Sequence, residues 1–170
     1  MAQKFAFGIK SMKSGGIDPV TGLPTALEDV GDIYKDTGEW IENDGTTTPH
    51  RSEFKNTPVV TVVEPGDEEF RFTLMDTSAK NLAKLCGGTV TEVIDQPDVW
   101  NKPKGVPNIE MSFVLQTEDG TEVTIHRGKV VGKRRLTPTR TGMFLIDVAV
   151  TPQEPLIADL PAVTSKDPVI

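Results

Sequence analysis

The amino-acid sequence predicts a mainly β fold, an antiparallel β-sandwich or barrel with one short α-helix laid against the sheet. Short runs of alternating apolar and polar residues recur along the chain, as in half-buried strands. Gly, Pro, Asn and Asp separate these runs and supply turns. Only one segment combines a helical apolar face with capping residues at both ends. An alternating order of strands and helices is therefore not expected.

The first strand candidate is residues 5–9, where Phe5, Phe7 and Ile9 alternate with Ala6 and Gly8. Two later stretches, residues 11–25 and 36–58, are rich in Gly, Pro, Thr and Asp and are predicted to be long loops. Unstructured loops of this length are uncommon inside a compact domain. Either they are disordered or a partner orders them.

The most informative segment is residues 59–93. Its run Val59–Val63 is β-branched throughout and predicts a strand. Pro65-Gly66-Asp67 then predicts a tight turn. A second strand follows, in which Phe70, Phe72 and Leu74 alternate with polar or flexible residues.

A helix is predicted over residues 78–86. Asp76, Thr77 and Ser78 offer side-chain oxygens to the free N–H groups at its start. Gly87-Gly88 ends it and leads into a further strand. The apolar positions follow the i, i+3, i+4, i+7 pattern of one helix face, at Ala79, Leu82, Ala83 and Cys86.

The C-terminal half predicts more strands. Ile109–Leu115 alternates, and Glu118-Asp119-Gly120 predicts a hairpin turn into Glu122–Arg127. Two further strands are expected over Lys129–Leu136 and Met143–Val150. Residues 151–170 hold four prolines and no clear period, which predicts an extended C-terminal arm. The expected organisation is thus one β domain over residues 1–150 followed by this arm.

Charge is unevenly distributed in a chain of 170 residues with a formal net charge of −7. Residues 27–76 hold thirteen acidic and four basic residues, whereas residues 102–140 hold eight basic and four acidic ones. If these regions lie on different faces, identical copies can meet acidic face to basic face, which generates rings or filaments. The alternative is that both runs are ordinary solvated surface.

No catalytic, metal or cofactor site is predicted, and we do not expect an enzyme. His50 and His126 stand alone, without other ligands at metal-binding spacing. Cys86 is the sole cysteine, so no disulfide can form within the chain, and we expect a buried, unreactive thiol in a protein assembled in a reducing cytoplasm. No apolar run predicts a membrane span, and no signal peptide is expected. Pairs of catalytic carboxylates stay an open alternative, because the distances between them are unknown.

The chain resembles the major tail proteins, or tail tube proteins, of long-tailed bacteriophages. The resemblance begins with Phe5–Lys10 and the Leu27–Ile33 element. It continues through the strand, helix and Gly-Gly of residues 70–90. It ends with the hairpin at Glu118–Gly120 and the sequence Val150–Pro155.

This resemblance implies a β-sandwich subunit with one flanking helix that assembles into hexameric rings stacked into a tube. DNA passes through the tube without specific binding, and no chemistry is performed or cofactor needed. The implied partners are further copies, the tape-measure protein, the tail terminator and baseplate proteins, with no membrane. The implied location is the virion tail, assembled in the host bacterial cytoplasm.

Two sets of residues are predicted to serve this assembly. The resemblance implies that the loop over residues 36–58 contacts neighbouring subunits or the next ring. The basic triplet 133–135 is expected to contact an acidic segment of a neighbouring subunit, which is favoured over binding to phosphate. Some carboxylates are expected to line the channel, since an acidic lumen repels DNA phosphates. The contact candidates are Trp40, Ile41, Phe54, Arg134 and Arg135, and the lumen candidates are Glu64, Asp67, Glu68, Glu69, Glu110, Glu118 and Glu122.

The sequence is also compatible with two other functions. A related tail component with the same fold is one, such as a hub or baseplate protein or the inner tube of a contractile system. A small-ligand β-barrel carrier is another, and it predicts a monomer with an apolar interior pocket. The sequence does not separate contractile from non-contractile tails, nor does it say whether the subunit is monomeric before assembly.

Overall fold

The computed structural model describes residues 7–168 of the chain. These residues form an eight-stranded antiparallel sheet in the order β2-β1-β9-β10-β11-β6-β3, with β12 paired to β10. The mainly β prediction with one short helix is confirmed. The strands of this sheet are β1 (Ser11–Ile17), β2 (Pro24–Asp29), β3 (Glu39–Glu42), β6 (Glu68–Leu74), β9 (Ile109–Gln116), β10 (Glu122–Leu136), β11 (Phe144–Pro152) and β12 (Val163–Lys166).

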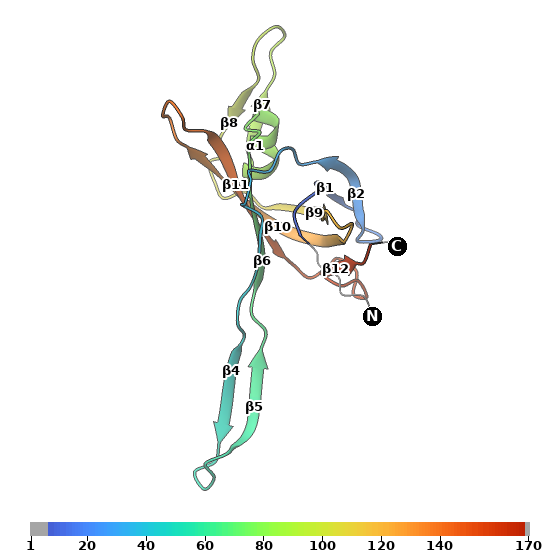
Figure 1. Cartoon of the computed structure of the whole chain (residues 1–170), viewed down its shortest axis with the longest axis vertical. Helices are drawn as coiled ribbons and strands as arrows, with labels where there is room; N and C mark the ends of the chain where they lie inside the picture. Colours follow the sequence, from blue (N-terminus) through green and yellow to red (C-terminus); the bar gives the residue numbers. More distant parts are fainter. Residues whose placement is uncertain (1–6, 169–170) are drawn as a thin grey trace.

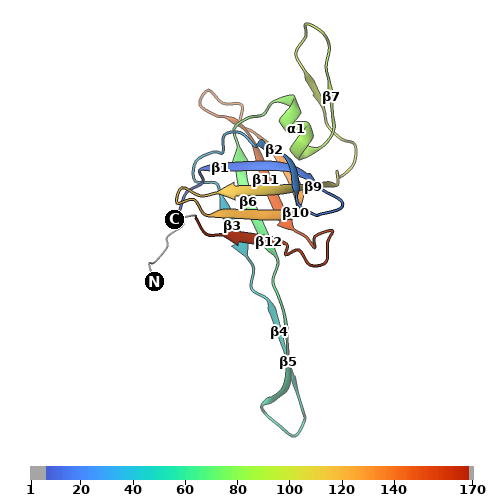
Figure 2. The same cartoon turned by 90° about the vertical axis from the view of Figure 1, so that its right-hand side faces the viewer.

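The sheet folds over into two layers. Figure 2 shows β1, β9, β12 and the near part of β10 running across β6 and β11, which lie behind them. Strand β10 belongs to both layers, because its first residues pair with β9 and β12 and its last residues pair with β11. This is the crossed arrangement in which a long strand makes the corner of a β-sandwich.

A β-bulge at the middle of β10 makes that corner. Phe113 of β9 lies opposite Ile125, but Met111 lies opposite Gly128, so β10 has one extra residue between these pairs. A Cβ at Gly128 would lie 2.5 Å from Cγ1 of Val150, which explains the glycine. The strands predicted over 122–127 and 129–136 are therefore one bent strand.

The core lies between the two layers. Phe72 of β6 and Phe113 of β9 are each 1% exposed, and their ring centroids are 6.2 Å apart in an edge-on contact. Ile146, Val148 and Val150 of β11 are buried as predicted. Phe144, predicted to lie on the same face, is 48% exposed because it lies where the β10–β11 hairpin extends past the core.

The predicted helix is confirmed as α1 (Ala79–Cys86). The Ser78 side chain accepts a hydrogen bond from the Asn81 N–H at 3.4 Å, and Leu82 and Leu85 are buried. Gly87 and Gly88 have positive φ angles of 74° and 98°, which glycine adopts without strain. The buried thiol predicted for Cys86 needs correction: the residue is half-buried, because it lies at the last turn of α1.

The prediction of a long loop over residues 36–58 is wrong. Apart from β3, it contains β4 (Thr46–Arg51), which pairs with β5 (Pro58–Glu64) in a two-stranded ribbon. Pro65-Gly66-Asp67 is not a tight turn either. Glu42 pairs with Glu68 and Thr46 pairs with Glu64, so β5 runs on into β6 in a single register. Glycine is needed at position 66 because the two segments of chain approach closely there: a Cβ would lie 1.7 Å from the Asn43 carbonyl oxygen.

The prediction of a loop over residues 11–25 is also wrong, since this range contains β1 and the start of β2. The strand predicted over 5–9 lies partly outside the described residues, and its residues 7–9 are not strand. Strand β1 escaped detection because its sequence, SMKSGGI, lacks a clear apolar alternation.

The C-terminal segment predicted to be an extended arm returns to the sheet. The Gln153 N–H donates to the Arg127 carbonyl at 2.8 Å, and β12 then pairs with the first residues of β10. This pairing satisfies backbone groups at the free side of β10. Within the described part of the chain, no helix has the length and apolar character needed to cross a bilayer.

Candidate assembly interface

The β4–β5 ribbon, here called the arm, projects from the sandwich along the long axis of the molecule (Figure 1). Every residue of β4 and β5 is exposed. Val59 and Val63 are 60% and 66% exposed, and Val60 and Val62 are 55% and 44% exposed. Because neighbouring strand residues point to opposite faces, both faces of the arm present valine to solvent.

An isolated two-stranded ribbon is marginally stable in water. The arm also has two outer edges whose backbone N–H and C=O groups can pair with another chain. Its strongly β-forming, apolar sequence therefore fits a segment that is covered in an assembly. Phe54 lies at the turn of the arm and is 93% exposed, which makes it the most accessible aromatic side chain there.

The contact candidates from the sequence do not come together. Trp40 packs on Phe70 with ring centroids 5.6 Å apart, so it fastens the base of the arm to the sandwich. Ile41 is half-buried beside it on β3, and Phe54 lies at the far end of the arm. Trp40 and Ile41 therefore anchor the arm to the sandwich, whereas Phe54 is exposed and free to contact a partner.

Arg134 and Arg135 lie on β10, and both are engaged within the chain. The Arg134 guanidinium lies 4.5 Å from the Trp100 ring centroid, a cation–π contact. Arg135 pairs with Asp147 of β11 at 3.1 Å. Both side chains are nevertheless exposed, so another molecule can still contact them.

The lumen candidates fall into two separate groups. Glu64, Asp67, Glu68 and Glu69 lie where the arm joins the sandwich, whereas Glu110, Glu118 and Glu122 lie on or beside β9 and β10. Three have ion-pair partners: Glu69 with Arg71, Glu110 with Arg127 and Glu122 with Lys166. Within residues 7–168, no ion pair engages the other four.

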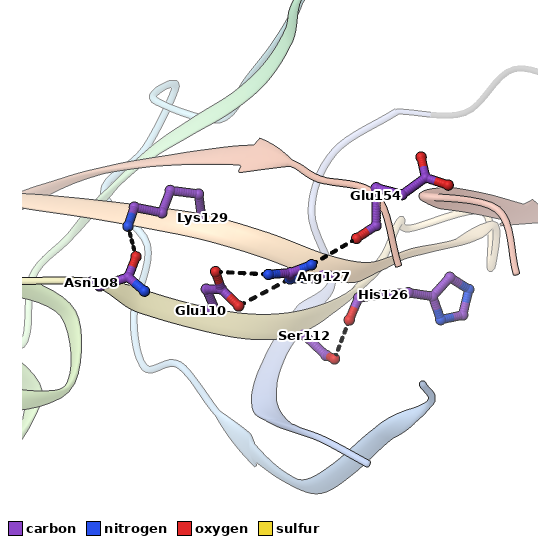
Figure 3. A network of polar contacts seen from close by, with 7 residues as sticks. All are labelled: Asn108, Glu110, Ser112, His126, Arg127, Lys129 and Glu154. Carbon is purple, nitrogen blue, oxygen red and sulfur yellow. Dashed lines mark hydrogen bonds and ion pairs between the residues drawn. The ribbon is translucent and has the colours of Figure 1, made fainter. Parts of the chain in front are cut away.

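Figure 3 shows that the Glu110 pair belongs to a network around the β10 bulge. Arg127 donates to both Glu110 oxygens at 2.9 and 3.1 Å, and to the Glu154 carbonyl at 3.1 Å. The Arg127 hydrogen bonds hold the pKa of Glu110 below its ordinary value. Ser112 Oγ donates to the His126 carbonyl at 2.6 Å, and Lys129 binds Asn108.

This network fixes the bulge and the returning C-terminal segment, so Glu110 has a structural role. His126 points away from the network, and its Nε2 lies 3.0 Å from Thr164 Oγ1 on β12. Its Nδ1 has no hydrogen-bond partner within residues 7–168. In the described part of the chain, no three His, Cys, Asp or Glu residues gather as a metal site.

Sequence reasoning missed a second projection and a groove. The hairpin of β7 (Thr89–Thr91) and β8 (Val99–Asn101) extends from α1 at the end of the molecule opposite the arm (Figure 1). Beside its base lies an open groove of about 440 Å³ that includes Trp100 and Val106. The apolar Val93-Ile94 pair among acidic residues was the available signal for the hairpin.

Neither a scan against models of protein families nor a search of curated proteins found a match to this chain.

Proposed function

We propose that this chain is a structural virion protein, the major tail tube subunit of a phage, whose copies assemble into stacked hexameric rings that conduct DNA. The arm is the observation that carries this proposal. It presents valine on both faces and two unpaired strand edges, although the sandwich has a core of its own. A segment of this composition gains stability when a neighbouring subunit covers it.

Further copies of the same chain are the partner we favour. The stretch from β3 to the start of β6, residues 39–69, holds eight acidic and two basic residues. Residues 102–140, which include β9 and β10, have an excess of basic ones. Contacts between unlike surfaces of identical copies are heterologous and generate rings or helical stacks. The resemblance to tail tube proteins points to the same kind of assembly.

The conduit role follows from charge. Glu64, Asp67, Glu68 and Glu118 are the lumen candidates without an intrachain ion pair among the described residues, so their charge is available to act on a passing polyanion. Such carboxylates repel phosphate, whereas a basic channel binds it with release of counterions. A tube of these subunits lets DNA slide without adhering.

The interior of the sandwich supports this proposal over a small-ligand carrier. Phe70, Phe72 and Phe113 form a chain of ring contacts, at 5.4 and 6.2 Å between centroids, across the space between the layers. A carrier needs that space for its ligand.

Removal of the arm tests the proposal. Asn43 and Asp67 are joined by a backbone hydrogen bond of 2.9 Å, so residues 44–66 can be replaced by an Asn-Gly turn. We expect this variant to fold with the same sheet and to remain monomeric in sizing experiments and negative-stain microscopy. The full chain should form rings or tubes as its concentration rises or when the other tail proteins are added.

A matched control keeps the arm and replaces its exposed Thr47 and Thr61 by serine, which leaves the ribbon pairing intact. Tubes formed equally well by the arm-deleted variant would refute the role of the arm. A full chain that stays monomeric beside its tail proteins would refute the tube function.

A further inference from the structure

The groove beside α1 is lined by both apolar and basic residues. Trp100, Val106 and Leu136 contribute apolar surface, and Val106 is 98% exposed. Lys102, Lys133 and Arg134 contribute positive charge. Neither lysine has an ion-pair partner among the described residues, so the groove carries unneutralised positive charge.

The tip of the β7–β8 hairpin has the complementary character. Ile94 is 91% exposed, and Val93 beside it is 47% exposed. Asp95 and Asp98 follow this apolar pair, and both are exposed. The tip has a defined shape, because Gln96 N–H donates to the Val93 carbonyl at 3.0 Å.

We infer that the tip of the β7–β8 hairpin of one copy docks into the groove of a second copy. Ile94 contacts the apolar residues of the groove, while Asp95 and Asp98 meet Lys102 and Lys133. An apolar anchor within a ring of opposite charges is the arrangement that gives protein interfaces both affinity and register. This inference rests on the proposed self-assembly and names a contact within it.

Another copy is the occupant we favour, because the tip and the groove are complementary in charge and the hairpin cannot reach its own groove. Trp100 and Lys102 stand at the base of the hairpin, and the tip projects away from that base (Figures 1 and 2). Trp100 is fixed there by its Nε1 hydrogen bond to the Gly87 carbonyl at 2.9 Å. A tip and a groove on one chain that cannot meet each other form a heterologous contact, which can close a ring.

Cross-linking between two variants tests this contact directly. One carries Ile94→Cys with Cys86→Ser, the other Val106→Cys with Cys86→Ser, so a 94–106 link can arise only between copies. A short bismaleimide is added during assembly, and linked peptides are identified by mass spectrometry. We expect roughly tenfold more 94–106 links than 94–20 links from a control that carries Val20→Cys, because docking raises the effective concentration of the paired thiols.

Rings or tubes without an excess of 94–106 links would overturn this inference and leave the tube function standing. Failure of the unmodified chain to assemble beside its tail proteins would overturn both.

Charge exchange provides a second, independent test. Asp98→Lys or Lys102→Glu alone should raise the concentration for half-assembly roughly tenfold, because each places like charges together. The two substitutions combined should restore assembly. Asp159→Lys, at an exposed carboxylate outside the hairpin, should have no effect. Natively folded single variants that assemble normally, or a double variant without rescue, would overturn the contact.

Discussion

Gly132 of β10 marks the place where α1 docks on the sheet, and its replacement by alanine measures how tightly the helix is held. A Cβ at position 132 would lie 2.5 Å from the Leu85 carbonyl oxygen and 3.0 Å from Cys86 Sγ. Ordinary contact begins near 3.4 Å, so the last turn of α1 must retreat by about 1 Å. Leu82 and Leu85 would then lose part of their packing against the core.

The expected cost is set by two opposing effects. Overpacking of a well-filled site costs about 1–3 kcal/mol. Alanine restricts the unfolded chain more than glycine does, which returns about 0.4–1 kcal/mol. We therefore expect the Gly132→Ala variant to lose roughly 1–2 kcal/mol of unfolding free energy, because the strain exceeds the entropy gain.

Equilibrium urea unfolding, followed by tryptophan fluorescence, measures this loss. Trp100 is a suitable reporter because it binds the Gly87 carbonyl directly after α1. Gly105 is the matched control, since a Cβ there has nothing within 4 Å. Gly105→Ala should be neutral or slightly stabilising. Equal unfolding free energies for the two variants would show that α1 is not packed against β10 as closely as described.

Two further predictions concern titration and DNA passage. Burial lowers the pKa of His126 below its ordinary value of 6.5, and the nearby Lys166 lowers it further. Because the unfolded chain binds this proton more readily, the contribution of His126 to stability is present above pH 6.5 and is lost as the pH falls below it. The urea midpoint should therefore fall as the pH is lowered, and His126→Gln should make the midpoint less dependent on pH. An equal pH dependence in the variant and the parent would contradict this role of His126. Reversal of Glu64, Asp67, Glu68 or Glu118 to lysine should leave tubes formed but slow DNA ejection, as a basic lumen binds phosphate. Unchanged infectivity across all four reversals would contradict an acidic channel.

The parts of the fold that the sequence predicted correctly are those with strong local signals. Strands β9 and β11 alternate over seven or more residues, and α1 has a cap, an apolar face and a glycine stop. Such elements bury one face, and burial imposes a period on their residues. The single continuous strand β10 was divided in the prediction because Gly128 resembles a break, whereas it sits at a bulge.

The parts that were missed depend on partners that are distant in the sequence. Strand β1 is held by β9, about a hundred residues away, and only Met12 gives it an apolar anchor in the core. Pro65-Gly66 has the composition of a turn, yet the glycine is required by the Asn43 carbonyl across the ribbon. Local composition cannot separate these two uses of glycine, because both need the absence of a side chain.

The same limit applies to the contact candidates. Large apolar residues in a polar stretch indicated a contact at Trp40 and Phe54, but the sequence did not reveal which one faces its own sandwich. Register decides this question: Trp40 pairs with Phe70 on the core side, whereas Phe54 lies beyond the last paired residues of the arm. The ion pairs of Glu69, Glu110 and Glu122 could not be predicted either. Glu110 and Glu122 pair with residues on neighbouring strands, and Glu69 pairs with Arg71 two residues along its own strand.

In the proposed assembly, stability and association depend on different parts of this molecule. The sandwich buries Phe72, Phe113 and Ile146 without help, whereas the arm and the β7–β8 hairpin carry valine and isoleucine that the sandwich does not cover. Exposed β-branched residues on paired strands add little to the fold of a single copy, since their gain comes from burial. Substitutions in the sandwich should therefore change unfolding, and those in the projections should change assembly. A Phe54→Ser variant that unfolds like the parent and yet fails to form tubes is the outcome that this division requires.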